Sequence, residues 1–151
     1  MPTHYTGTRT EMRTLDTFIK LSRCHDSVIA RLAEHNTIGD LTFSQFAVLE
    51  ALYHLGHLTQ GEISNKILKS TSNITTVIDN LERNGLVRRE RNEKDRRVIH
   101  VHLTEAGTNK VEAVFPDHMA ALVEIFSILS ASEQQTLGAL CKKLGKGKES
   151  E

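Results

Sequence analysis

Residues 70–107, STSNITTVIDNLERNGLVRRERNEKDRRVIHVHLTEAG, decide the fold of this chain. Four apolar residues in the first part of this stretch recur on one helix face: Ile74, Val77, Ile78 and Leu81. Gly85, followed by an apolar residue, is typical of a left-handed helix end. The charged run RNEKDRR then separates residues 86–90 from residues 98–103, where polar and apolar side chains alternate. We therefore expect a helix, a short strand, a charged turn and a second strand.

Two further helices are expected before this segment. Thr42 lies three positions before Gln45, and Thr59 lies three before Glu62, the spacing of a capping box, in which the two residues satisfy orphan backbone N–H groups at a helix start. The break between the helix after Thr59 and the next one is only a few residues long. A short helix, a tight turn and a second amphipathic helix are the parts of a helix-turn-helix, although an ordinary helical hairpin shares them. Because two strands with a charged turn follow directly, we interpret residues 42–104 as a winged helix-turn-helix.

The helices outside that lobe carry apolar stripes of their own. We expect them within residues 15–35 and 105–144, and Ser130 with Glu133 supplies a third capping box. These helices hold more apolar positions than so small a lobe needs to cover itself. The sequence therefore predicts a mainly α protein with a small β-hairpin wing, a single domain over residues 1–151, whose terminal helices form a homodimer.

The composition argues against several classes of protein. Of the 151 residues, 38% are hydrophobic and 25% are charged, and no apolar run approaches the roughly 18 residues of a membrane span. The N-terminus lacks the apolar core of a secretory signal, so we expect a cytoplasmic protein with no membrane partner. The sequence also contains no Gly-rich phosphate loop, no metal-ligand cluster and no nucleophile motif. We therefore expect neither an enzyme nor a bound metal or cofactor.

The charges balance over the chain but are unevenly distributed. The 19 basic residues equal the 19 acidic ones, yet residues 83–97 contain seven basic and three acidic side chains, a net charge of +4. A basic lobe of this kind is expected of a surface that contacts phosphates, whereas a charged run taken alone is more often a solvated loop. Its place beside the helix-turn-helix favours double-stranded DNA as the partner.

One face of the helix after the turn carries short polar side chains. With Ile74 taken as the inward direction and about 100° per residue, Thr76 points away from the core and Asn73 flanks that direction. Ser, Thr and Asn are donors and acceptors that can reach base edges, and Asn pairs with adenine. The candidates for contact with base edges are Ser72, Asn73, Thr75 and Thr76. Ser70 is expected to cap the helix, whose first N–H groups then approach a phosphate.

The same segment resembles a known family. Residues 95–107, DRRVIHVHLTEAG, resemble the signature of the multiple-antibiotic-resistance regulator (MarR) family. Residues 70–90, STSNITTVIDNLERNGLVRRE, are similar to that family's recognition helix and its exit into a strand. The order of helices before and after also agrees, so the resemblance covers about residues 15–144.

The resemblance implies a two-fold dimer in which the terminal helices form the platform and each winged lobe faces DNA. It implies that Arg97 enters the minor groove from the wing tip and that Asp95 holds it. Four other cations are then expected to contact phosphates or neutralise the flanks: Arg89, Arg91, Lys94 and Arg96. Members of the family mostly repress transcription from palindromic operators, and a small ligand, a metal or cysteine oxidation releases the DNA. We expect such a repressor here, with a small-molecule effector that the sequence does not identify.

Two residues of the first helix are candidates for the trigger. Cys24 lies beside the apolar stripe, where some family members place a redox cysteine, but a buried structural thiol is the favoured interpretation. His25 falls on the stripe, where it either lines the effector pocket or is a core histidine. The spacing of the histidines does not support a metal site. Two alternatives stay open: a redox-sensing regulator that uses Cys24, and a winged-helix module that binds a protein in place of DNA.

Overall fold

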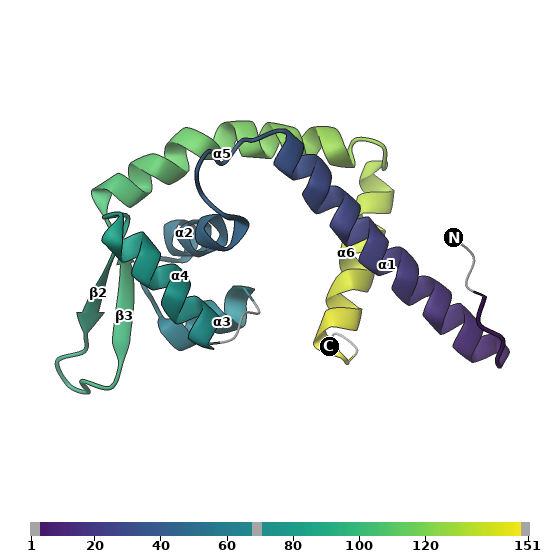
Figure 1. The fold of residues 1–151 in the computed structure, drawn as a ribbon, viewed down its shortest axis with the longest axis horizontal. Helices are drawn as coiled ribbons and strands as arrows, with labels where there is room; N and C mark the ends of the chain where they lie inside the picture. Colours follow the sequence, from purple (N-terminus) through teal and green to yellow (C-terminus); the bar gives the residue numbers. More distant parts are fainter. Residues whose placement is uncertain (1–3, 68–70, 149–151) are drawn as a thin grey trace. The chain divides into compact units, whose positions relative to one another are not determined.

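The computed structural model describes residues 4–67 and 71–148, with the backbone but not the side chains of Thr71 and Ser72. Its elements are, in chain order, α1 (Arg9–Glu34), α2 (Phe43–Leu55), β1 (Leu58–Thr59), α3 (Gln60–Ile67), α4 (Thr71–Arg83), β2 (Val87–Arg91), β3 (Ile99–Leu103), α5 (Glu105–Phe126) and α6 (Ala131–Lys146) (Figure 1). The chain divides into two compact units, residues 37–118 and residues 1–36 with 119–151. We call the first the winged unit and the second the terminal-helix unit.

Helices and a small sheet enclose the core of the winged unit. The sheet is antiparallel in the order β1-β3-β2, with Leu58 opposite Val101 and Val87 opposite Leu103. The largest fully buried side chains of the described residues all lie in this unit: Val48, Leu49, Ile63, Ile74, Ile78, Leu81, Val87, Val101 and Val111. Because burying one such side chain contributes about 1.5 to 3 kcal/mol, this core is the main source of stability of the unit.

The helix starts follow the capping signals of the sequence. The three expected capping boxes are present: Thr42 with Gln45, Thr59 with Glu62, and Ser130 with Glu133. A fourth box, between Thr8 and Glu11, opens α1 at Arg9, so this helix starts six residues before the expected Leu15. The backbone N–H and hydroxyl of Thr8 hold the pKa of Glu11 below its ordinary value, because hydrogen bonds to a carboxylate favour its charged form.

The turn at Gly85 and Leu86 joins the end of α4 to the start of α5 through hydrogen bonds. Gly85 has a φ of +75°, and the N–H of Leu86 donates to the carbonyl of Leu81 at 2.9 Å, which confirms the predicted left-handed stop. The Thr104 N–H donates to the Leu86 carbonyl at 3.1 Å, and its hydroxyl donates to the Gly85 carbonyl at 2.6 Å. A Cβ on Gly107 would lie 2.1 Å from the Leu86 carbonyl oxygen. Residues 104–107 (TEAG) therefore pack and hydrogen-bond the start of α5 against the end of α4.

The terminal-helix unit buries little within one chain. Among its described residues only Leu32, Ala121 and Ile125 are buried, and α6 has no buried residue. Large apolar side chains are instead exposed on all three of its helical segments and in the turn after α5: Phe18, Leu21, Met119, Val123, Ile128, Leu137, Leu140 and Leu144. Five of them, Phe18, Leu21, Leu137, Leu140 and Leu144, belong to the apolar stripes that the sequence predicts, so the single chain leaves these stripes partly uncovered.

Two further features of the fold differ from the expectation. The strand β1, which pairs with β3, was not expected, because two residues are too few for a visible alternation. The first half of α5 belongs to the winged unit, since Val111 is buried in its core and Val114 and Phe115 pack against it. The lobe therefore extends beyond the expected 42–104 to 37–118.

No single helix in the described part of the chain has the length and apolarity of a membrane crossing; α5 and α6 meet that criterion only as a pair bent by 100°.

Candidate nucleic-acid interface

The exposed face of α4 carries polar side chains along its length. Ile74 and Ile78 are fully buried. Because a helix turns by about 100° per residue, Asn73, Thr76 and Asp79 lie on the opposite side, where all three are exposed. The orientation predicted for Asn73 and Thr76 is thus confirmed, and their contact with base edges stays a prediction.

The other candidates on or near this helix are not placed on its exposed face by the structure. Thr75 is half-buried, and its hydroxyl accepts a hydrogen bond from the Gln60 side chain of α3 at 3.3 Å. This side chain therefore faces the protein rather than the exposed side of α4. Ser70 lies outside the described residues, as does the side chain of Ser72.

The loop between β2 and β3 is held by its own polar groups. The Asn92 side-chain oxygen accepts from the backbone N–H of Lys94 at 2.8 Å and of Asp95 at 3.3 Å. The Arg91 guanidinium donates to the Arg96 carbonyl across the loop at 2.9 Å. Because these bonds hold the backbone, the exposed side chains of Lys94 and Arg96 project from a defined turn.

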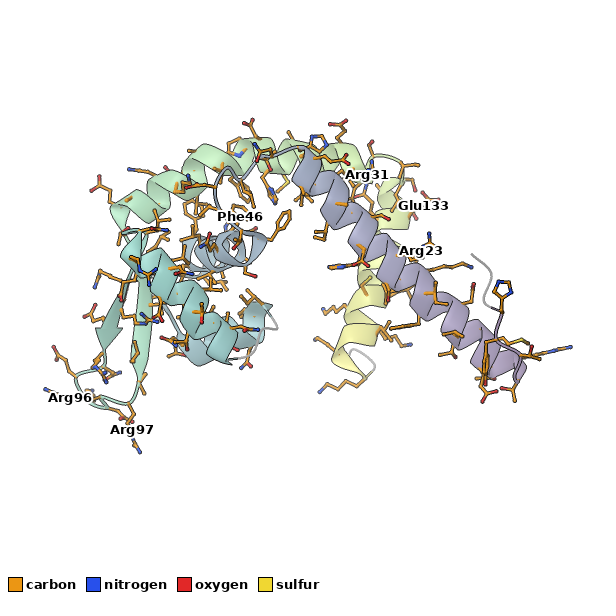
Figure 2. The ribbon with its side chains drawn as sticks, viewed as in Figure 1. Arg23, Arg31, Phe46, Arg96, Arg97 and Glu133 are labelled. Carbon is orange, nitrogen blue, oxygen red and sulfur yellow. The ribbon has the colours of Figure 1, made fainter. Side chains whose placement is uncertain are left out.

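The tip of the wing presents Arg97 (Figure 2), which the neighbouring Asp95 holds in place. The backbone N–H and Nε of Arg97 both donate to Asp95 Oδ1 at 3.1 Å, and its Nη2 donates to Oδ2 at 3.3 Å. The Arg97 guanidinium and backbone N–H hold the pKa of Asp95 below its usual range. The Arg97 side chain is nevertheless 91% exposed. Asp95 thus holds Arg97 as the resemblance implies, and the guanidinium remains open to a partner.

The structure gives Arg89 a different setting from the expected one. In β2 the side chains alternate between the faces of the sheet, and Arg89 lies opposite the fully buried Val101. Its guanidinium therefore points toward α4, where it binds Asp79 and Glu82 at 2.6 and 3.1 Å. Since its side chain is only 19% exposed, Arg89 lies inside the winged unit rather than on its exposed surface.

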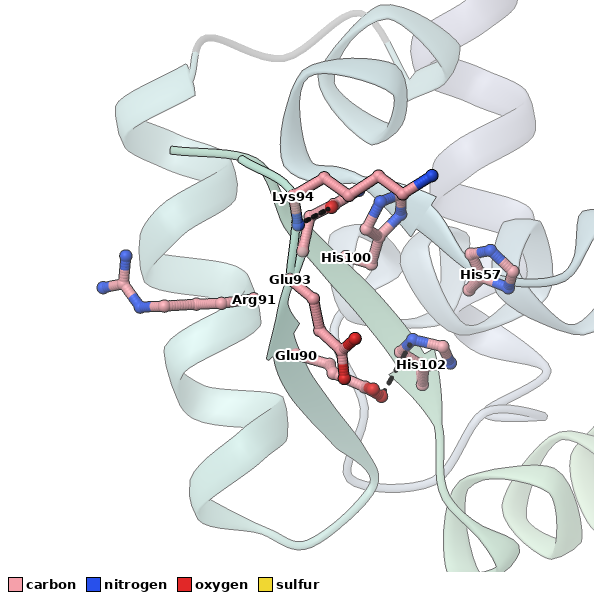
Figure 3. Close-up of a pocket in the computed structure, with 8 residues that line it drawn as sticks. His57, Glu90, Arg91, Glu93, Lys94, His100 and His102 are labelled. Atoms are coloured by element: carbon pink, nitrogen blue, oxygen red, sulfur yellow. Dashed lines mark hydrogen bonds and ion pairs between the residues drawn. The ribbon is translucent and has the colours of Figure 1, made fainter. Parts of the chain in front are cut away.

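The opposite face of the sheet gathers three histidines, of which the sequence indicated only the pairing of His100 with His102 on one face of a strand. His100 and His102 of β3 lie on one face, and the ring of His57, just before β1, lies 5.3 and 4.8 Å from their rings (Figure 3). Glu90 of β2 approaches His102 Nε2 at 3.4 Å. Together with residues of the wing loop these side chains line a hollow of about 450 Å³. The sequence holds no signal for His57, because only the pairing of β1 with β3 brings it to this face.

The charged groups near these histidines shift the pKa of His102 in opposite directions. Burial, and then the nearby Arg88 guanidinium, lower the pKa of His102, while Glu90 acts in the opposite direction. Nδ1 of His100 is buried and has no hydrogen-bond partner among the described residues. Within residues 4–67 and 71–148, no group of three or more His, Cys, Asp or Glu side chains is arranged to hold a metal ion.

The two trigger candidates lie in the terminal-helix unit and are both exposed. A hollow of about 210 Å³ in this unit is lined by Cys24, Val28, Arg31, Ile125, Phe126, Ile128, Leu129 and Leu137. The expectation of a buried thiol at Cys24 is wrong for the single chain, because this side chain is exposed. His25 is neither a core histidine nor part of this hollow, since its side chain is 72% exposed beside Asp26.

Comparisons with known proteins agree with this geometry. The sequence model of the MarR family matches residues 41–99. The HTH-type transcriptional regulator MhqR of Bacillus subtilis (strain 168) is 37% identical over 133 residues, which cover 88% of this chain and 92% of that protein. The HTH-type transcriptional repressor MdtR of the same organism is 32% identical over 111 residues, 74% of this chain and 72% of that protein.

A solved structure shows the same fold. BpsR of Bordetella bronchiseptica, whose DNA binding is regulated by 6-hydroxynicotinic acid, matches with a TM-score of 0.78 at 26% identity. The match covers 86% of this chain and 98% of the BpsR chain. The expected fold class, mainly α with a small β-hairpin wing in a winged helix-turn-helix, is thereby confirmed.

Proposed function

This chain belongs to the MarR family of transcription regulators, and we propose that it acts in the cytoplasm as a homodimeric repressor that binds a palindromic DNA operator. In this proposal α4 reads base edges in the major groove and the wing tip enters the adjacent minor groove. A small molecule releases the protein from DNA. Catalysis has no part in this function.

The observation that carries the proposal is the exposed Arg97 guanidinium held by Asp95. A planar cation fits the narrow, negative minor groove of DNA well. The bonds to Asp95 orient the side chain before it binds, so that less side-chain entropy is lost in the complex. The exposed polar face of α4 supplies the second contact surface.

The proposed homodimer is supported by the exposed apolar side chains of the terminal-helix unit. An apolar face of this extent is unfavourable in water and is typical of a surface that another protein covers. A second copy of the chain is the partner that two-fold operator symmetry requires. The small-molecule effector is supported by BpsR, whose DNA binding responds to such a ligand.

The experiment selects a DNA duplex from a random-sequence pool with the full chain and then measures its affinity for Arg97→Ala. We expect this substitution to weaken binding by about 1 to 3 kcal/mol. Arg88→Ala is the matched control, because this arginine of the same hairpin is exposed but paired with Glu90 at 2.7 Å. It should leave the affinity within a few-fold of wild type.

Salt dependence separates DNA from a protein partner. Phosphate contacts release counterions, so the affinity should fall steeply between about 50 and 200 mM salt. An unchanged affinity of Arg97→Ala would remove the wing from the interface. A wild-type chain that selects no duplex would contradict the DNA-binding function and favour the protein-binding alternative.

A further inference from the structure

Arg89 uses nearly all of its hydrogen-bonding capacity inside the winged unit. Its Nε donates to Gln60 Oε1 at 2.9 Å, and its Nη1 donates to Glu82 Oε1 at 3.1 Å. Its Nη2 donates to Asp79 Oδ1 at 2.6 Å and to the Thr75 carbonyl at 3.4 Å. A guanidinium has five N–H donors in one plane, so four of them are engaged by three different positions of α4 and one of α3.

The same residue also binds through its backbone. The N–H of Arg89 donates to Glu82 Oε2 at 2.8 Å, so Glu82 grips both the backbone and the side chain of this strand residue. The Gln60 amide in turn donates to the Thr75 hydroxyl. One network therefore joins β2, α3 and α4, the strand that leads to the wing tip and the two helices of the helix-turn-helix.

We infer that Arg89 is a positioning residue for DNA recognition: it sets the rotation of α4 relative to the wing strand, so that both surfaces meet DNA in one register. The inference rests on the DNA-binding function proposed above. Arg89 itself makes no DNA contact. It acts through Asp79, Glu82 and the backbone of Thr75.

Two features of the network distinguish this role from a phosphate contact. To reach a phosphate, the guanidinium would have to leave four hydrogen bonds and two carboxylates, which costs more than an exposed contact returns. Asp79 and Glu82 would then carry uncompensated negative charge on α4, beside the DNA. The exposed Arg96 at the wing tip meets neither obstacle.

Arginine is required in this role because the network depends on shape as well as charge. A lysine keeps the positive charge but has a single compact ammonium, which cannot bridge residues on two helices in one plane. Arg89→Lys therefore preserves neutralisation of the carboxylates and removes the planar connection between α3 and α4.

The experiment compares two duplexes: the one that the wild-type chain selects from a random pool, and a scrambled duplex of the same composition. For Arg89→Lys we expect the affinity for the selected duplex to fall about tenfold, the size of one lost base-pair contact. The affinity for the scrambled duplex should stay at the wild-type value. A phosphate-contacting arginine would give equal losses on both duplexes or none.

A second variant removes the ion pair between Arg89 and Asp79 without changing the local net charge. In Arg89→Gln with Asp79→Asn, the ratio of the affinities for the selected and the scrambled duplex, which we call the specificity ratio, should fall. The slope of log affinity against log salt should stay unchanged. Arg96→Ala is the matched control, which should lower the slope by about one and weaken both duplexes alike. Gln60→Ala, which removes a single neutral acceptor, should lower the specificity ratio less than Arg89→Lys. Circular dichroism and the unfolding midpoint identify any variant that fails to fold.

The outcomes separate this inference from the proposed function. The inference alone is overturned if Arg89→Lys and Gln60→Ala both keep the wild-type ratio of affinities for the selected and scrambled duplexes. It is also overturned if the double variant Arg89→Gln with Asp79→Asn lowers the slope of log affinity against log salt by about one. A wild-type chain that selects no duplex overturns the DNA-binding function and the inference with it. A lower specificity ratio at an unchanged salt slope, in variants that fold like wild type, establishes the positioning role.

Discussion

The winged unit buries many of its large apolar side chains, whereas the terminal-helix unit leaves many of its own exposed. In the winged unit, Leu49, Ile63 and Ile78 are fully buried by other parts of the same unit. In the terminal-helix unit, Val123, Leu140 and Leu144 remain more than half exposed, and α6 buries nothing. The winged unit therefore closes its own core, whereas the terminal-helix unit lacks the surface that would complete it.

This difference locates the two kinds of intermolecular contact. A unit with a closed core can present a rigid polar surface, because its helices are held from within. An open apolar face gains free energy only when another chain covers it. The difference supports the proposal that the winged unit contacts DNA and that the terminal-helix unit self-associates, and each of the following substitutions tests one side of it.

The largest effect is expected from a charge placed on the open face. Leu140→Asp should raise the dimer dissociation constant on the order of 1,000-fold, because an isolated buried carboxylate is costly and a two-fold interface contains the change twice. Sedimentation or light scattering over a concentration series measures it. Gln135→Asp places the same charge on the opposite side of α6 and should leave the dimer intact. A wild-type chain that is a stable monomer would contradict the proposal that a second copy covers the apolar face of the terminal-helix unit.

A smaller effect is expected inside the closed unit. Gly107→Ala should destabilise the fold by about 1 to 3 kcal/mol, because the added Cβ would lie 2.1 Å from the Leu86 carbonyl oxygen and force the backbone to move. The free energy of unfolding in urea measures the loss. Gly61→Ala is the control, since its Cβ would have no neighbour closer than 3.9 Å. Equal stability of the two variants would show that the α4–α5 junction is loosely packed.

The smallest effect is a dependence of stability on pH in the winged unit. His118 is only 6% exposed, its Nδ1 lies 3.1 Å from the Thr37 hydroxyl, and its ring packs on Phe46. Burial lowers the pKa of His118, against a weaker opposing effect of Glu50. The folded state thus disfavours the protonated form, so this contribution to stability is present above the unfolded pKa of about 6.5 and is lost as the pH falls.

Urea midpoints at about pH 7.5 and pH 5.5 test this dependence. The midpoint of the wild-type chain should be lower at the acidic pH, and His118→Gln should reduce that difference. Some of the difference should remain, since the pKa of His102 is lowered in the same direction. His25→Gln removes an exposed imidazole and serves as the control. A pH difference that His118→Gln leaves at its full size would exclude His118 as its source.

Most of the fold could be predicted because its signals are local. Capping boxes join residues three positions apart, and the inward face of α4 follows from the helical repeat of Ile74, Ile78 and Leu81. The start of α1 was placed too late, because the box between Thr8 and Glu11 lies before any apolar stripe. The two-residue β1 is too short to leave a periodic signal.

The candidate site was predicted less completely. The wing tip could be placed, because Asp95 and Arg97 are two residues apart in one turn. Basic charge alone could not distinguish the exposed Arg97 from Arg89, which faces α4. The exposure of Cys24 was also missed, because an apolar stripe indicates burial only when something covers it.

The sequence by itself determined the starts of α2, α3 and α6, the stop of α4, the polar face of α4, the charged turn of the wing and the family. The structural features among these depend on residues within a few positions of one another, so chain geometry and backbone hydrogen bonding suffice to set them. Only the tertiary structure decided that Arg89 turns inward, that His57 joins the histidines of β3, and that α5 serves two units. These features depend on segments far apart in the chain, and their contacts form only when the core of the winged unit closes.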